Sequence, residues 1–190
     1  GRYHGVSAFN REEGVSPTPK IDYSFIAGKT LCEMAEKDKS ICAVTAAMTG
    51  GTGLNEFSQK FSDRFFDVGI AEEHAVTFSS ALAKGGLKPY FAVYSSFLQR
   101  SYDQIIHDAA IASLPLRLLV DRAGLVGEDG KTHHGLFDLA YFSHIPNMTL
   151  LAPKDGDEFQ DMMKFCFKFN GPIAIRYPRG NYTSSLIPSL

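Results

Sequence analysis

Short apolar runs recur along the chain, and stretches with helical spacing lie between most of them. The runs are rich in Val, Ile, Leu and Phe and span residues 41–45, 64–68, 88–93, 116–120, 148–151 and 172–176. They lack a regular alternation of polar and apolar residues, which is typical of strands buried on both faces. Strands that alternate with helices form βαβ units. The sequence therefore predicts an α/β fold, a three-layer α/β/α domain with a mostly parallel sheet of about six strands.

Four stretches carry apolar residues at helical spacing, and Asp22 is a suitable N-cap for the first of them. They span residues 23–37, 71–84, 97–112 and 155–169. Residues 1–20 mix Gly, Pro, Ser and charged residues without a period, so we expect an arm or linker there, followed by a domain over 21–182. The chain begins with Gly1 and shows no signal region, so we expect a piece of a longer chain, in which 183–190 start a linker to a further domain.

Composition and charge exclude several classes of protein. With 190 residues, of which 44% are hydrophobic, the chain has enough apolar material for one sizeable core. A formal net charge of −2 argues against a dominant nucleic-acid-binding surface. No run approaches the roughly 20 apolar residues of a membrane span. We therefore expect no nucleic-acid partner and no membrane partner.

The cysteines and histidines do not predict a metal site. Cys32, Cys42 and Cys166 are odd in number and widely spaced, so we expect buried free thiols in a reducing cytoplasm rather than zinc ligands or disulfides. His133 and His134 are adjacent, and neighbouring side chains rarely converge on one ion. Two other histidines, each in a predicted helix, are expected at the surface or hydrogen-bonded in the core. They are His74 and His107.

Polar and aromatic residues follow the predicted strands. Ligands of open parallel sheets bind beyond the carboxyl ends of the strands, so these residues predict a site at one edge of the sheet. They are the glycine loop 48–53, Glu72, Tyr94 and Phe97, Arg122 with the loop 123–135, and Arg176 and Arg179.

Each of these features also has a structural interpretation. The glycine loop lacks the Lys-Ser/Thr of a P-loop and is equally a plain turn. Glu72 lies in the first turn of a predicted helix, where carboxylates are common because of the helix dipole. The loop 123–135 is long for a compact domain, which favours a function. The arginines near this edge suit either an anion site or structural ion pairs. They are Arg100, Arg122, Arg176 and Arg179.

The run Asp-Val-Gly-Ile-Ala-Glu-Glu-His-Ala-Val at residues 67–76 resembles the pyrimidine-binding domain of thiamine diphosphate enzymes of the transketolase type. Three further blocks narrow the resemblance to the 1-deoxy-D-xylulose-5-phosphate synthase family. They lie at residues 94–104, 121–135 and 176–180. The similarity covers nearly the whole chain, including the start of the arm.

The resemblance implies an enzyme that condenses pyruvate with glyceraldehyde 3-phosphate and releases carbon dioxide. This reaction feeds the methylerythritol phosphate route to isoprenoids and the synthesis of thiamine and pyridoxal. The resemblance further implies thiamine diphosphate and magnesium as cofactors, a homodimer as the full-length enzyme, and a location in the bacterial cytoplasm or a plastid.

Family roles carry over to matching positions. Glu72 is implied to hydrogen-bond the aminopyrimidine of the cofactor and to take part in its activation. Phe97 is implied to stack on that ring, and Tyr94 to lie close to cofactor and substrate. The resemblance thus predicts a catalytic site that contains Glu72, Tyr94 and Phe97, together with His133 and Asp129.

The remaining roles concern the substrates. His133 and Asp129 are implied to contact the hydroxyl or aldehyde of the acceptor and to handle protons. Arg122 and Arg176 are implied to hold its phosphate, and Arg100 the carboxylate of the pyruvate adduct. Arg179 is a weaker candidate.

Other parts of the family's site are missing from this sequence. The motif that binds diphosphate and magnesium, Gly-Asp-Gly followed by a downstream Asn, belongs to another domain, and residues 127–130 resemble it only superficially. Glu73 stands where the family often has Gln. We therefore expect the isolated chain to be inactive and to hold no metal. Two rivals are another transketolase-like ketol transfer and a non-catalytic domain that binds a partner or a nucleotide. The presence of Glu72, Phe97 and His133 argues against the second.

Overall fold

The computed structural model describes residues 11–12 and 21–182. The predicted arm at 1–20 and linker at 183–190 lie outside the described residues, apart from positions 11 and 12. The six strands form one sheet in the order β2-β1-β3-β4-β6-β5, and every pair of neighbours is parallel. They are β1 (Ile41–Thr45), β2 (Phe65–Asp67), β3 (Lys88–Tyr94), β4 (Arg117–Asp121), β5 (Thr149–Leu151) and β6 (Ile173–Arg176). The predicted parallel sheet of about six strands is confirmed.

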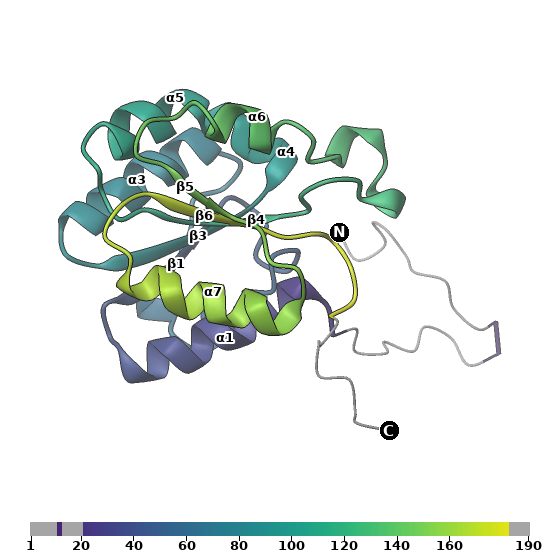
Figure 1. Ribbon diagram of the computed structural model, residues 1–190. Coiled ribbons are helices and arrows are strands. Elements are labelled where there is room, and N and C mark those ends of the chain that lie inside the picture. Colours follow the sequence, from purple (N-terminus) through teal and green to yellow (C-terminus); the bar gives the residue numbers. More distant parts are fainter. Residues whose placement is uncertain (1–10, 13–20, 183–190) are drawn as a thin grey trace, which may run out of the picture.

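Helices cover both faces of the sheet (Figure 1). One face carries α1 (Tyr23–Lys37), α2 (Asn55–Lys60) and α7 (Gly156–Lys168). The other carries α3 (Glu72–Lys84), α4 (Ser95–Leu98), α5 (Tyr102–Gln104) and α6 (Asp138–Phe142). Asp22 caps α1 as predicted, because its carboxylate accepts from the Phe25 amide. The three-layer α/β/α architecture is thus confirmed.

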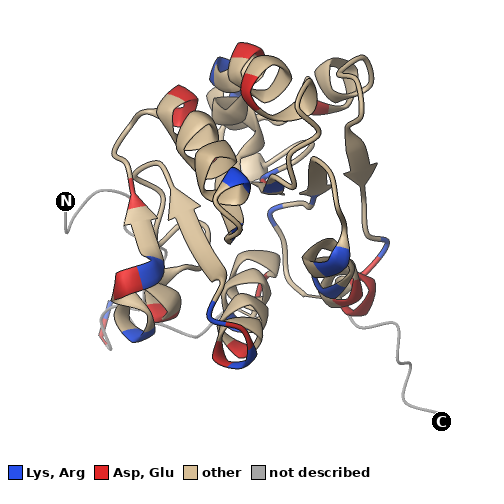
Figure 2. Cartoon of the chain, turned by 90° about the vertical axis from the view of Figure 1, so that its left-hand side faces the viewer, with Lys and Arg blue, Asp and Glu red and all other residues tan. Residues whose placement is uncertain are grey.

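The core consists of two apolar clusters, one on each side of the sheet. Leu31, Phe57 and Phe159 belong to the first, and Val76 and Phe142 to the second. Within the strands, charged residues occupy only first or last positions, so the strand ribbons are almost wholly tan in Figure 2. Strands without charge in their middle can be buried on both faces, which explains the missing polar alternation.

The segment predicted as a helix over 97–112 is helical from Ser95 to Ala110, but it is not one regular α-helix. The chain there runs through α4, a 3₁₀ turn at Gln99–Ser101, α5 and a π-helical turn at Ile105–Ala110. A tight 3₁₀ turn followed by a wide π turn keeps the average rotation close to that of an α-helix. Leu98 and Ile105 are therefore both buried, and their spacing suggested one helix. The short α2 and α6 were not predicted.

The strand order places one crevice beyond the carboxyl ends of β1 and β3. The chain leaves β1 toward β2 on one side, whereas β3 pairs with the other side of β1. Such a reversal of strand order is where open α/β sheets bind ligands. The glycine loop after β1 packs closely against α1 here. A Cβ added to Gly28 of α1 would stand only 1.9 Å from the Gly53 carbonyl oxygen of the loop.

Candidate active site

Glu72 is the first residue of α3, and its side chain is only 2% exposed. Its Oε1 accepts from Arg100 Nη1 at 2.8 Å. The Arg100 guanidinium carbon also lies 5.1 Å from the centre of the Phe97 ring. Phe97 and Arg100 are one turn apart in the segment after β3, so both point to the same place. A buried carboxylate and an aromatic ring are thus joined by one cation.

Tyr94, Phe97 and His133 form an aromatic wall beside Glu72 and Arg100. The Tyr94 and Phe97 rings stack at 5.7 Å with an angle of 18° between their planes. The His133 ring meets Phe97 edge-on at 5.3 Å. Burial raises the pKa of Tyr94, so its hydroxyl stays protonated at neutral pH. This wall offers flat apolar surface and one hydrogen-bonding ring to a planar ligand.

Arg122 links the wall to the glycine loop. Its guanidinium lies 3.8 Å from the centre of the Tyr94 ring, and Nη1 donates to the Gly51 carbonyl at 2.7 Å. The backbone of Arg122 is left-handed, with φ 58°. That conformation is strained for a residue with a side chain and is typical of functional sites. The glycine loop therefore forms part of the site by its backbone, an outcome that its motif did not reveal.

Asp121, the last residue of β4, contacts both the backbone and the guanidinium of Arg122. Its side chain is fully buried and accepts from Ser24 Oγ at 2.6 Å and from the Arg122 amide at 2.7 Å, with the guanidinium 3.1 Å away. Burial raises its pKa to about 6. Sequence reasoning missed this residue as a site member. Its position at a strand end, directly before Arg122, is the available signal.

Asp129 holds the loop after β4 onto the site. Oδ2 accepts from Arg122 Nε at 3.3 Å, and Oδ1 accepts from Arg179 Nη1 at 2.7 Å. Paired backbone hydrogen bonds between Gly124 and Gly135, each 2.8 Å, close the loop at its base. The loop predicted to be functional thus contributes Asp129 and His133 to one contact network that runs from Glu72 to Arg179.

His133 and His134 point to different neighbours. His133 lies against Phe97 and Thr132, whereas His134 Nδ1 accepts from the Val126 amide at 3.2 Å. In the part of the chain that the structure describes, no group of three or more His, Cys, Asp or Glu side chains could hold a metal ion.

Arg176 lies outside this network. Its Nε donates to Asp138 Oδ2 at 2.8 Å, and Asp138 is fully buried at the start of α6. The predicted cluster of four arginines is therefore divided among separate carboxylates. Arg100 pairs with Glu72, Arg122 and Arg179 share Asp129, and Arg176 has Asp138. Asp138 had no signal in the sequence because α6 was not predicted.

A pocket of about 400 Å³ opens beside Arg122, on the side of the sheet that α1 covers. Ser24, Phe25 and Lys29 of α1 face the glycine loop and Asn55 across it. Its wall combines Lys29 and Arg122 with the carboxylates of Asp22 and Glu56 and with glycine backbone, a mixed set that suits a polar group. The pocket meets the aromatic wall through Arg122.

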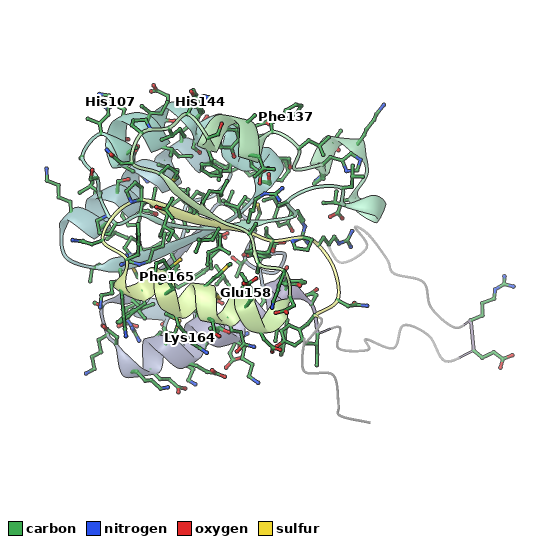
Figure 3. The ribbon with its side chains drawn as sticks, in the orientation of Figure 1. His107, Phe137, His144, Glu158, Lys164 and Phe165 are labelled. Carbon is green, nitrogen blue, oxygen red and sulfur yellow. The ribbon has the colours of Figure 1, made fainter. Side chains whose placement is uncertain are left out.

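The other predictions about single residues have simple outcomes. Cys32, Cys42 and Cys166 are buried free thiols, as expected, and burial raises their pKa values to about 11, 11 and 12. His74 and His107 are exposed, the latter on the outer surface of the helical layer (Figure 3). Among the described helices, none is long and apolar enough to cross a membrane.

Comparison with known proteins identifies the family. The profile described as "Transketolase, pyrimidine binding domain" matches residues 19–185. The chain belongs to the transketolase pyrimidine-binding domain family. It is 59% identical over 182 residues to the 1-deoxy-D-xylulose-5-phosphate synthase of Alkaliphilus oremlandii, which covers 95% of this chain and 29% of that protein. It is 52% identical over 188 residues to the synthase of Clostridium tetani, covering 98% of this chain and 30% of that protein. The chain thus spans less than a third of the length of these relatives.

Solved structures show the same domain fold. A transketolase of Campylobacter jejuni has a TM-score of 0.78 at 21% identity, over 86% of this chain and 26% of that one. A structure titled "Split gene transketolase, inactive beta4 tetramer" has a TM-score of 0.77 at 25% identity, over 90% of this chain and 56% of that one. The transketolase pyrimidine-binding domain therefore keeps its architecture at low sequence identity.

Proposed function

We propose that the chain is the pyrimidine-binding domain of a 1-deoxy-D-xylulose-5-phosphate synthase that uses thiamine diphosphate. The observation that carries the proposal is Glu72, a buried carboxylate beside the aromatic wall at the switch point of the sheet. Identity of 59% and 52% to proteins of that name supports it. In the proposal, the enzyme joins pyruvate to glyceraldehyde 3-phosphate with loss of carbon dioxide, for isoprenoid, thiamine and pyridoxal synthesis.

The residues fit the aminopyrimidine half of the cofactor. When bound, thiamine diphosphate supplies the electron sink for breaking a bond next to a keto group. The Glu72 carboxyl group hydrogen-bonds a ring nitrogen and shares one proton with it, in a position that burial shields from water. Phe97 stacks on the ring, and Tyr94 closes the wall beside it. Each role needs only the residue types and places described above.

The acceptor substrate lies toward the loop after β4 in this proposal. His133 and Asp129 contact its hydroxyl or aldehyde group and exchange protons with it. Arg122 and Arg176 bind its phosphate, for which guanidinium groups are well suited. Arg100 binds the carboxylate of pyruvate. Arg176 must turn from Asp138 to take part, whereas Arg122 already faces the pocket.

The proposal assigns only part of the site to this chain. Magnesium and the diphosphate are held by another domain, and the isolated chain is inactive. The complete enzyme is a homodimer of the cytoplasm or a plastid. The chain's share of 29% of its relatives' length supports the division of the site. A related precedent is the split-gene transketolase chain whose title calls it an inactive tetramer.

Substitution of Glu72 in the full-length protein tests the role of this domain. Glu72→Gln should lower the rate of product formation from pyruvate and glyceraldehyde 3-phosphate by at least 100-fold without changing the circular dichroism spectrum. Glu73→Gln is the matched control, because Glu73 is exposed and neighbours Glu72. It should keep near-normal activity. An active Glu72→Gln enzyme, or turnover by the isolated 190-residue chain, would contradict the proposal.

A further inference from the structure

Arg100 touches both groups that the proposed function assigns to the pyrimidine ring. Nη1 donates to Glu72 Oε1 at 2.8 Å, and the guanidinium carbon lies 5.1 Å from the centre of the Phe97 ring. Phe97 has two other aromatic contacts, because Tyr94 stacks on it and His133 meets it edge-on. Arg100 makes a third contact with Phe97 while it is bound to Glu72.

A guanidinium and an aminopyrimidine have similar binding chemistry. Both are planar and conjugated, and both stack on aromatic faces. Both also hydrogen-bond a carboxyl group in their own plane, the guanidinium through N–H donors and the aminopyrimidine through its amino group or through a ring nitrogen that shares a proton with the carboxyl group. A site built to bind one will therefore bind the other. The two groups cannot occupy the same space between one carboxylate and one ring.

The two partners of the ion pair differ in exposure. The Glu72 side chain is 2% exposed, whereas that of Arg100 is 48% exposed. Glu72 is fixed at the start of a long helix, and Arg100 reaches it from the solvent side along a flexible side chain. Arg100 can therefore leave while Glu72 stays.

We propose that Arg100 is an internal competitor of the cofactor ring. Its guanidinium fills the place between Glu72 and Phe97, and the incoming aminopyrimidine displaces it. Once displaced, the same cation is released to bind the carboxylate of the second ligand, pyruvate. This couples cofactor binding to substrate binding through one side chain, and it rests on the proposed function.

The proposal makes a prediction opposite to that of simple electrostatics. Removing a cation near an anionic cofactor should weaken its binding by Coulomb's law. If Arg100 competes, its removal should instead strengthen the binding of the ring. Glu72 would then be a buried carboxyl group without its hydrogen-bond partner, and the aminopyrimidine would restore one.

The experiment measures binding rather than turnover. The 190-residue chain and its Arg100→Ala and Arg100→Gln variants are titrated with 4-amino-5-hydroxymethyl-2-methylpyrimidine, which has no diphosphate, and binding is followed by ¹⁵N NMR. Both variants should bind this pyrimidine about tenfold more tightly than the parent chain, which corresponds to about 1.4 kcal/mol. Lys131→Ala removes an equal charge from an exposed position in the nearby loop and should leave the affinity unchanged.

The full-length protein supplies the second measurement. Arg100→Gln should lower the Kd for thiamine diphosphate, measured by calorimetry with magnesium, and raise the KM for pyruvate. Equal or weaker binding of both ligands by the variants would overturn the competitor role and leave the proposed function standing. If the full-length parent protein itself fails to bind thiamine diphosphate, both the inference and the proposed function are overturned. Since Arg100→Gln keeps a polar side chain of similar length, it distinguishes loss of competition from loss of the fold.

Discussion

The arginines at the two edges of the sheet bind different kinds of partner. At the amino edge, which Figure 2 views from outside, Arg117 and Arg64 donate to backbone carbonyls at the ends of neighbouring segments. At the carboxyl edge, the arginines face carboxylates of acidic side chains, and Arg122 adds one carbonyl, that of Gly51. Backbone carbonyls cannot be exchanged for a ligand, but a carboxylate partner is readily replaced by a phosphate or a carboxylate of a substrate.

The hydrogen-bond partner of an arginine, rather than the residue type, therefore distinguishes a structural arginine from one that is available to bind a ligand. Arg117 is 4% exposed and is held by the carbonyls of Pro115, Cys166, Phe167 and Phe169. It fixes the end of α7 to the start of β4. Arg179 is a third exposed and shares Asp129 with Arg122. We expect the first to matter for stability and the second for ligands.

The largest predicted effect is on stability at the amino edge. Arg117→Ala should lower the free energy of unfolding by about 4 kcal/mol, because several buried carbonyls lose their donor and a cavity remains. Arg179→Ala, the matched change at the carboxyl edge, should cost at most about 1 kcal/mol because its ion pair is partly solvated. Urea unfolding followed by circular dichroism measures both. Equal losses of unfolding free energy in the two variants would contradict the proposed difference between the two edges.

The same distinction limits what sequence can reveal. The strands were predictable because each is a run of residues buried on both faces. Tyr94, Phe97 and Glu72 were placed at the sheet edge because each follows a strand, and their roles were predicted from the family resemblance. Asp121 had only its position at a strand end as a signal, and Asp138 had none, since the contacts of each are made with a residue far along the chain. Asp121 binds Ser24 across 97 positions, and Asp138 binds Arg176 across 38. Local patterns carry no information about such pairs.

The helix predicted over 97–112 is present but irregular, for a related reason. Its apolar spacing was read correctly, but alternating tight and wide turns preserve that spacing while changing the backbone. The consequence bears on the site, because the 3₁₀ turn at Gln99–Ser101 carries Arg100 toward Glu72.

The next effect concerns the buried charge at the carboxyl edge. Burial raises the pKa of Asp121 from 3.8 to about 6, so between these values the folded protein binds a proton that the unfolded chain has released. The contribution of Asp121 to the free energy of unfolding is therefore complete below about pH 4. It falls by about 3 kcal/mol as the pH rises through about 6. Asp38 at the amino edge acts in the opposite sense, because Lys88 lowers its pKa to about 2 and its contribution is lost only on acidification below about pH 4.

Urea unfolding between pH 4 and pH 7 tests this prediction, with Asp121→Asn as the control. The amide does not titrate in this range, so the variant should show a flatter dependence on pH. Besides Ser24, the groups that face Asp121 include Arg122, Asp22, Tyr94 and Tyr177. Tyr177 stays neutral throughout, since burial raises its pKa well above the ordinary value. Parallel curves for the parent chain and the variant would assign the pH dependence to other groups.

The smallest effect concerns the contact between the glycine loop and the aromatic wall. A Cβ on Gly51 would stand 1.7 Å from the Tyr94 hydroxyl, whereas one on Gly50 would meet only Asn55 at 3.7 Å. Gly51→Ala must therefore push Tyr94 away from Arg122, and Gly50→Ala need not move it. Both changes restrict the unfolded chain equally, so the difference between them isolates the contact. Because the clash is with the far end of a side chain, we expect Gly51→Ala to be only about 1 kcal/mol less stable than Gly50→Ala, while the NMR signals of the Tyr94 ring shift in Gly51→Ala alone. Unshifted Tyr94 signals would show that the glycine loop and the wall are not in contact, and the carboxyl edge would then lose one of its links between β1 and β3.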